Sequence, residues 1–222
     1  MSTSIAAPAV RITEVYASVQ GESTWAGLAC TFIRLARCNL RCVWCDTTYS
    51  FHGGEMRAIA DLVAEARAIG HPLVEVTGGE PLAQPECADL CQALIDAGFT
   101  VLVETSGSLP IDTLPEPVVR IMDLKCPGSG ECDKNHWPNI GYLKPERDEV
   151  KFVIAGREDY EWARDTIREH ALETRCKAVL LSPVFGSVEP RDIVDWMLED
   201  ALPARFQLQM HKFIWPPEAR GV

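Results

Sequence analysis

The chain has 222 residues, 47% of them hydrophobic, and a formal net charge of −11. This composition supports a sizeable core and excludes disordered, collagen-like and coiled-coil chains. The acidic balance argues against nucleic-acid binding, and the apolar runs fall far short of the roughly 20 residues that span a bilayer. The N-terminus has no basic segment followed by an apolar run, so we expect a cytoplasmic protein with neither nucleic-acid nor membrane partners.

Short runs rich in β-branched and apolar residues predict strands. In chain order they cover residues 11–19, 29–36, 72–78, 100–107, 118–125, 149–156, 178–184 and 206–212. Amphipathic patterns between these runs predict helices. They are expected at residues 59–69, 87–95 and 157–170, with a fourth beginning near Pro190, a favourable first-turn residue.

Strands that alternate with helices imply parallel pairing with right-handed crossovers. We therefore expect one α/β domain over residues 1–222, an open sheet or a partial barrel, with residues 1–10 flexible and residues 217–222 as a C-terminal extension. Unusual residues follow the strands: a cysteine group follows 29–36, and a double glycine ends 72–78. The carboxyl ends of parallel strands share one face, so we expect an active site on that face.

Cys38, Cys42 and Cys45 place three thiols within eight positions of one loop. A structural zinc site takes four ligands, and this group offers three. Three thiolates suit a 4Fe–4S cluster in which one iron stays open to another ligand. A zinc-stabilised binding module is the alternative, and metal analysis after anaerobic purification separates the two.

The remaining cysteines have no regular spacing and suggest no disulfide framework. Cys87 and Cys91 lie on the apolar stripe of their helix and are expected in the core. By residue type, Cys126, Cys132 and His136 could form a second metal site. Their glycine-rich surroundings favour a structured loop instead, so we expect no auxiliary cluster.

The pattern Cys38-x3-Cys42-x2-Cys45 resembles the signature of the radical S-adenosylmethionine enzymes. The resemblance implies a (β/α) barrel of that type, here a partial and open one, with the cluster loop after the first barrel strand. It also implies that S-adenosylmethionine binds the open iron. One electron from the cluster then cleaves it to methionine and a 5′-deoxyadenosyl radical.

Residues 77–81 read TGGEP at a strand end. Adjacent glycines allow a close backbone approach to a ligand, and Glu80 can accept a hydrogen bond from an ammonium. Standing alone, this stretch would be an ordinary glycine turn. After a cysteine loop and one βα unit, it resembles the GGE motif of the same family, which holds the amino group of the cofactor.

Four further stretches are similar to one branch of that superfamily, the 7-carboxy-7-deazaguanine synthases. They are EVYASVQGES before the cysteines, CDT at the last cysteine, MDLKCPGSGE in mid-chain and QMHKF near the end. The resemblance implies a lyase that contracts 6-carboxy-5,6,7,8-tetrahydropterin to 7-carboxy-7-deazaguanine and ammonia, in 7-deazapurine (queuosine) biosynthesis. It also implies Mg²⁺, a homodimer, and flavodoxin or ferredoxin as electron donor.

The same resemblance implies roles for single residues. Thr47 is the expected Mg²⁺ ligand, and Arg34 is expected to bind the substrate carboxylate. The other expected substrate contacts are Val19, Gln20, Gly21, Glu22, Thr77, His211 and Pro216. The expected cofactor contacts are Trp44, Asp46, Gly79, Glu80, Asp123, Leu124, Lys125, Ser182, Pro183, Val184 and Phe185.

The C-terminus departs from the family pattern. Some relatives end near the position of Pro216 and use the terminal carboxylate to hold substrate, whereas PEARGV follows Pro216 here. That role is therefore not carried over to this chain. A glycyl-radical-enzyme activase shares the cysteine signature and is the second enzyme hypothesis. The VQGE, CDT and QMHK stretches argue against it.

Overall fold

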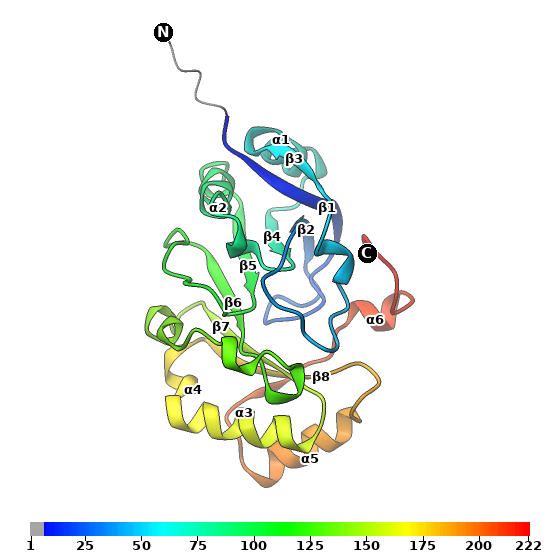
Figure 1. The fold of residues 1–222 in the computed structure, drawn as a ribbon, viewed down its shortest axis with the longest axis vertical. Helices are drawn as coiled ribbons and strands as arrows, with labels where there is room; N and C mark the ends of the chain where they lie inside the picture. The colour runs from blue at the N-terminus through cyan, green and yellow to red at the C-terminus, as the bar shows by residue number, and fades with distance from the viewer. Residues whose placement is uncertain (1–6) are drawn as a thin grey trace.

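One nine-stranded sheet organises the computed structural model, which describes residues 7–222 (Figure 1). The strands lie in the order β3-β1-β2-β4-β5-β6-β7-β8-β9, and β3 and β9 form the open edges. Their bounds are β1 (Ala9–Val19), β2 (Ala29–Leu35), β3 (Glu55–Ala58), β4 (Leu73–Gly78), β5 (Thr100–Thr105), β6 (Val119–Asp123), β7 (Glu149–Ile154), β8 (Ala178–Pro183) and β9 (Arg205–Phe206). All neighbouring pairs from β2 to β9 are parallel, which confirms an α/β fold of the partial-barrel type.

Helices fill most connections between the parallel strands. Their bounds are α1 (Ile59–Ile69), α2 (Cys87–Asp96), α3 (Arg157–His170), α4 (Leu172–Arg175), α5 (Pro190–Glu199) and α6 (His211–Ile214). Short 3₁₀ turns lie at Thr48–Ser50, Pro81–Ala83, Pro127–Ser129, Cys132–Lys134 and Trp137–Tyr142. The four predicted helices are confirmed as α1, α2, α3 and α5. Within residues 7–222, no helix has the length and apolar character needed to cross a membrane.

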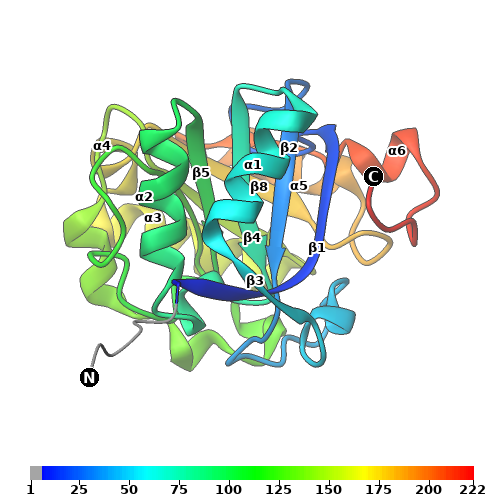
Figure 2. The same cartoon turned by 90° about the horizontal axis from the view of Figure 1, so that it is seen from above.

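Helices α1 to α5 pack on the outer side of the sheet, as Figure 2 shows for α1 and α2. Helix α1 buries Ile59, Leu62 and Ala66 in a cluster with apolar residues of β2, β4 and α2. A second cluster joins β6, β7 and β8 to α3, α4 and α5. Burial of apolar side chains in these two clusters stabilises the fold by roughly 25 cal/mol per Å² of apolar surface removed from water.

The inner side of the sheet is polar near the carboxyl ends of the strands. Alternation along β4 places Val74 and Val76 in the outer cluster, whereas Glu75 and Thr77 line the inner space. Deeper in the sheet, an apolar cluster is formed by Cys30, Phe32, Leu73, Leu102, Val119 and Ile121. The inner side therefore combines an apolar base with charged groups above it.

Two features at the N-terminal edge differ from the expectation. Strand β1 pairs antiparallel with β2 and with β3, a strand that the sequence did not predict. Residues 20–28 connect β1 to β2, and so short a connection cannot make the crossover that parallel pairing requires. Of the ten N-terminal residues expected to be flexible, 1–6 lie outside the described residues. Ala9 begins β1, and Val10 is fully buried in it.

The strand expected over residues 206–212 is mostly absent, because β9 ends at Phe206 and residues 211–214 form α6. The Gln207 N–H donates to the Leu181 carbonyl at 2.9 Å, as a parallel ladder requires. The next bond of that ladder needs a backbone N–H at Pro183, which proline lacks. The chain therefore leaves the sheet at this point, and α6 lies against the cavity described below.

Candidate active site

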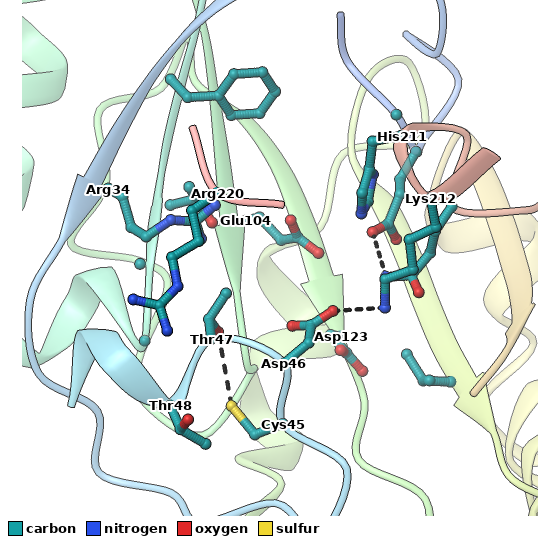
Figure 3. A pocket seen from close by; sticks show the side chains of 18 of the residues that line it. Arg34, Cys45, Asp46, Thr47, Thr48, Glu104, Asp123, His211, Lys212 and Arg220 are labelled. Atoms are coloured by element: carbon teal, nitrogen blue, oxygen red, sulfur yellow. Dashed lines mark hydrogen bonds and ion pairs between the residues drawn. The ribbon is translucent and has the colours of Figure 1, made fainter. Parts of the chain in front are cut away.

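A cavity of about 510 Å³ lies at the carboxyl ends of the inner strands (Figure 3). Its wall combines the loop after β2, the ends of β4 to β7 and the segment around α6. Figure 3 shows Arg34, Glu104, Asp123 and His211 around the same space. Segments far apart in the sequence thus bring their charged side chains to one site.

The thiols of Cys38, Cys42 and Cys45 line this cavity and are half-buried. The Leu40 N–H donates to the Cys38 sulfur at 3.4 Å, and burial raises the pKa of the Cys38 and Cys42 thiols. Among residues 7–222, no three Cys, His, Asp or Glu side chains meet as ligands of one metal ion. Three separate thiols facing one cavity fit a 4Fe–4S cluster, in which each thiolate holds a different iron.

Gly78 and Gly79 allow the end of β4 to lie against the cysteine loop. A Cβ on Gly79 would stand 2.5 Å from the Arg37 carbonyl oxygen and 2.6 Å from the Cys38 Cβ. A Cβ on Gly78 would clash with the Leu35 carbonyl oxygen. We expected the glycines to admit a ligand, but their Cβ positions point at the protein's own chain. Their lack of side chains therefore serves the close packing of the loop.

Glu80 is fully buried behind the cavity wall. Its carboxylate accepts hydrogen bonds from Leu82 N at 3.0 Å, Thr105 Oγ1 at 2.9 Å, and Ser106 N and Oγ at 2.7 and 2.5 Å. These bonds tie the end of β4 to the end of β5. They also occupy both oxygens, so the predicted contact of Glu80 with the cofactor ammonium stays a prediction.

Asp123 and Lys125 form an ion pair at the end of β6, with Lys125 Nζ 2.7 Å from Asp123 Oδ2. Burial alone would lower the pKa of Lys125, but the charge of Asp123 outweighs it and the pKa is raised. Asp123 Oδ1 is buried with no hydrogen-bond partner among residues 7–222. Leaving such an acceptor unpaired costs about 1–3 kcal/mol. This atom therefore fits a ligand that donates a hydrogen bond, as the hydroxyl and amino groups of S-adenosylmethionine do.

Lys151 on β7 lies between two carboxylates from other segments. Its Nζ is 2.5 Å from Glu22 Oε2 and 2.6 Å from Glu104 Oε1. Burial by itself would lower the pKa of Lys151, but the charges of Glu104 and Glu22 raise it well above its usual range. Burial would likewise raise the pKa of Glu22, and the Lys151 charge instead lowers it. Lys151 and Glu22 are therefore held in their ionised forms, in a largely buried network that includes Glu104.

Glu75 on β4 has a different environment. It is buried, lines the same cavity and accepts a hydrogen bond from the side-chain amide of Gln20. Burial raises its pKa well above the ordinary glutamate value, and the charges of Glu104 and Glu22 raise it further. The cavity thus holds a carboxyl group that favours its neutral form beside an ionised network.

Arg34 is fixed by two partners on β1. Its Nε donates to Glu14 Oε1 at 2.8 Å, and its Nη2 donates to the Tyr16 hydroxyl at 2.9 Å. The Tyr49 hydroxyl donates to the same Glu14 oxygen at 2.8 Å. These contacts hold the guanidinium in one plane at the cavity wall, which suits planar recognition of a carboxylate.

The segment around α6 closes the cavity on the side of residues 20–22. A Cβ on Gly21 would stand 2.5 Å from His211 Nδ1, so this glycine makes room for the imidazole. Burial lowers the pKa of His211, which keeps the ring neutral at pH 7. Lys212 Nζ lies 2.9 Å from Asp46 Oδ2, a contact visible in Figure 3. This ion pair connects α6 to the cysteine loop.

Most residues predicted to contact cofactor or substrate line this one cavity. They are Val19, Gln20, Gly21, Glu22, Arg34, Cys38, Cys42, Trp44, Cys45, Asp46, Thr47, Thr77, Gly79, Asp123, Lys125, Val184, Phe185 and His211. Their individual roles stay predictions.

Five predicted contacts, Glu80 among them, do not line the cavity. The side chains of Leu124 and Ser182 are buried, so a contact there would have to come from backbone atoms. Pro183 lines a separate cavity of about 240 Å³, and Pro216 is exposed.

Among the charged residues of the cavity that were missed, three lie on the strands: Glu75, Glu104 and Lys151. Each is a single charge inside an apolar strand run, in PLVEVTG, TVLVETSG and EVKFVIAG. A charge in a buried strand is costly unless it is paired, so this pattern could have found them. The structure also places residues 217–222 at the cavity, where the sequence indicated only an extension.

The open α/β barrel with three thiols on the loop after β2 defines the class of protein. The pattern of the Radical SAM superfamily matches residues 32–169, and the chain belongs to that superfamily. The 7-carboxy-7-deazaguanine synthase of Koribacter versatilis is 45% identical over 227 residues, covering 96% of this chain and 100% of the relative. The synthase of Chlorobaculum tepidum is 45% identical over 215 residues, covering 96% and 97%. The chain therefore belongs to the family of 7-carboxy-7-deazaguanine synthases.

A solved structure supports the same fold. The crystal structure of QueE from Escherichia coli matches with a TM-score of 0.74 at 22% sequence identity. The match covers 91% of this chain and 95% of that one. The similarity in fold therefore extends over almost the whole length of both chains.

Proposed function

We propose that this chain converts 6-carboxy-5,6,7,8-tetrahydropterin to 7-carboxy-7-deazaguanine with release of ammonia, in the biosynthesis of 7-deazapurines such as queuosine. The observation that carries the proposal is the meeting of the three thiols, Arg34 and Thr47 at one cavity of about 510 Å³. Relatives that bear the synthase name over nearly the whole chain support it.

Formation of the radical requires two cofactors, which the cavity residues fit. When bound, a 4Fe–4S cluster and S-adenosylmethionine supply the 5′-deoxyadenosyl radical that removes a hydrogen from the substrate. Cys38, Cys42 and Cys45 would hold the cluster, and Asp123 would accept a hydrogen bond from the S-adenosylmethionine. The protein's own contribution is a fixed geometry and a pocket that excludes water.

The opposite side of the cavity would bind the substrate. Arg34, held by Glu14 and Tyr16, presents a fixed guanidinium to the substrate carboxylate. The network of Lys151 with Glu22 is preformed and offers carboxylate oxygens to the N–H groups of a pterin ring. These groups would orient the ring before reaction, because their positions are set by contacts within the protein.

Thr47 is the proposed protein ligand of Mg²⁺. Its hydroxyl lies 3.7 Å from the Cys45 sulfur and lines the cavity. Mg²⁺ often takes few protein ligands and completes its octahedron with substrate and water oxygens, which fits a single hydroxyl here. The ion would then connect the substrate to the loop that carries the cluster.

The reaction is tested on anaerobically reconstituted protein with the pterin, S-adenosylmethionine, Mg²⁺ and dithionite. We expect ammonia and the deazapurine in equal amounts. Cofactor cleavage without a deazapurine would contradict the proposal, and so would a colourless protein that holds zinc and no iron.

Thr47 is tested by Thr47→Val, with Thr48→Val as the matched control at the neighbouring position of the cavity wall. We expect Thr47→Val to raise the Mg²⁺ concentration needed for half-maximal rate about tenfold or more and to lower kcat. Thr48→Val should leave both values close to those of the unchanged protein. Equal Mg²⁺ dependence in the two variants would remove Thr47 from the metal site.

We also propose a cytoplasmic homodimer that takes electrons from flavodoxin or ferredoxin. Exposed Arg37 and Arg41 flank Cys38 and would attract an acidic redox protein toward the cluster loop. Exposed apolar side chains at Phe185, Phe213 and Ile214 support self-association. Light scattering tests the dimer, and reduction of the cluster by each purified donor tests the electron source.

A further inference from the structure

The C-terminal extension forms part of the cavity wall. Residues 217–222 all line the cavity that holds the cysteine loop and Arg34. The Ala219 N–H donates to the Pro216 carbonyl at 2.8 Å, which turns the chain back toward the site. A Cβ on Gly221 would stand 3.9 Å from Glu14 Oε2, so the tail reaches the carboxylate that holds Arg34.

The tail places a second guanidinium beside Arg34. The guanidinium carbon of Arg220 lies 4.2 Å from the ring centroid of Tyr49, and that of Arg34 lies 6.0 Å from the same centroid. Figure 3 shows both side chains on the same side of the cavity. Stacking on Tyr49 holds the Arg220 cation without neutralising its charge.

Arg220 differs from the other cations of the cavity in its pairing. The cavity is lined by five lysine and arginine side chains. Four of them form ion pairs with carboxylates: Arg34 with Glu14, Lys125 with Asp123, Lys151 with Glu22 and Glu104, and Lys212 with Asp46. No ion pair of Arg220 occurs among residues 7–222. An anionic ligand gains most from a cation whose charge is not already balanced.

We propose that Arg220 is a substrate-binding residue, contributed by the C-terminal extension, that binds the substrate carboxylate together with Arg34. The inference rests on the proposed function, because that function supplies the carboxylate. Both guanidinium groups lie by the Tyr49 ring at the cavity wall, and the tail would cover a carboxylate bound there. The extension thus has a binding role that does not depend on a chain terminus.

Arg220→Gln tests this role in the reconstituted enzyme, because glutamine keeps much of the side chain and removes the charge. Arg67→Gln is the control, at an exposed arginine in the last turn of α1 on the outer side of the sheet. We expect the KM for the carboxylated pterin to rise about tenfold with Arg220→Gln, with a smaller change in kcat. Arg220→Lys should recover part of the loss, since it restores the charge without the planar fork.

A pterin without the carboxylate separates binding from a structural effect. Tetrahydropterin, used as a competitive inhibitor, should bind Arg220→Gln as well as it binds the unchanged enzyme. Equal weakening of both pterins would overturn the proposal, because the tail would then shape the pocket as a whole. A KM of Arg220→Gln equal to that of Arg67→Gln would also overturn the proposal. Turnover by the unchanged enzyme is measured first: its failure refutes the proposed function, whereas normal turnover with an unaltered Arg220→Gln refutes the role of Arg220 alone.

Discussion

The two sides of the cavity differ in whether their reactive side chains have charged partners within the protein. On the thiol side, Cys38, Cys42 and Cys45 face the cavity, and within residues 7–222 they form no shared site for a single metal ion. On the ion-pair side, Arg34 and Lys151 are held by carboxylates at 2.5–2.8 Å. The thiol side is completed by a cofactor, whereas the ion-pair side holds its shape through its own contacts.

This difference indicates which part of the chemistry each side contributes. A metal cluster brings its own geometry, so the loop needs only to present thiols at a suitable spacing. A substrate must instead be oriented by groups that are already fixed, because mobile groups would lose the benefit of orientation. Changes on the thiol side should therefore affect cofactor content, and changes on the ion-pair side should affect substrate binding and stability.

The largest effect is expected on the thiol side from Cys42→Ala. Loss of one of three thiolates should abolish iron–sulfur absorbance and lower activity by at least about 10³-fold, while the fold persists because Cys42 lies on a half-exposed loop. Iron analysis and circular dichroism measure the two outcomes. Cys132→Ala is the control, at another half-buried cysteine outside the cavity. Iron loss in Cys132→Ala would show that the cluster depends on a residue outside the loop.

The ion-pair side is tested by Lys151→Met, which leaves the carboxylates of Glu22 and Glu104 buried without their shared cation. We expect a loss of about 3–5 kcal/mol in the free energy of unfolding and a fall of about a hundredfold in kcat/KM, with iron content preserved. Urea denaturation and steady-state kinetics measure these effects. Lys134→Met, at an exposed ion pair, should change little.

A second variant sharpens this test. Adding Glu104→Gln to Lys151→Met removes one of the two uncompensated charges and should recover part of the lost stability. Additive losses in the double variant would mean that Lys151 acts through packing of its side chain instead of its charge.

Much of the fold follows from patterns along the chain. The apolar period from Ile59 to Ile69 located α1, and the acidic start and basic end of residues 157–170 located α3. The antiparallel pairing of β1 with β2 follows from the short connection at residues 20–28. The patterns that predict single strands take no account of connection length. The early end of β9 is caused by Pro183 in the neighbouring strand β8. It therefore depends on a contact between segments that are distant in the sequence.

The candidate site likewise has a part that local sequence patterns predict and a part that depends on contacts between distant segments. The spacing of the three cysteines is local, so the sequence could group the three thiols on one loop, and the structure places them at one cavity. The partners of Lys151 lie 129 and 47 residues away from it, and no local pattern connects them. The position of Arg220 against Tyr49 depends on a turn that brings the C-terminus across the site. The resemblance to the family predicted no role for Arg220, because some relatives end before that position.

Gly79→Ala tests how closely the cysteine loop packs against the end of β4. An added Cβ would stand 2.5 Å from the Arg37 carbonyl oxygen, so the cysteine loop must shift. We expect a loss of about 1–3 kcal/mol in stability and incomplete iron loading after reconstitution. Gly141→Ala is the control, since nothing lies within 4 Å of the Cβ position there. Normal iron content in Gly79→Ala would show that the loop adjusts without losing the thiol geometry.

The smallest effect concerns Glu75, the carboxyl group of the ion-pair side that favours its neutral form. Burial, reinforced by Glu104 and Glu22, raises its pKa in the folded protein. The folded state therefore keeps a proton that the unfolded chain releases above its ordinary pKa of about 4.3. Stability from this group is fully present below that value and is lost as the pH rises through the higher folded pKa.

Glu75→Gln removes this titration while keeping a side chain of the same size. We expect the variant to match the unchanged protein near pH 4.5 and to exceed its stability by on the order of 1 kcal/mol at pH 8, with the difference growing between those values. Thermal unfolding across this pH range measures the effect, and Glu86→Gln, at an exposed glutamate, is the control. A stability difference that stays constant with pH would mean that Glu75 is ionised in the folded protein. The single Lys151 ammonium would then face three carboxylate charges instead of two before substrate binds.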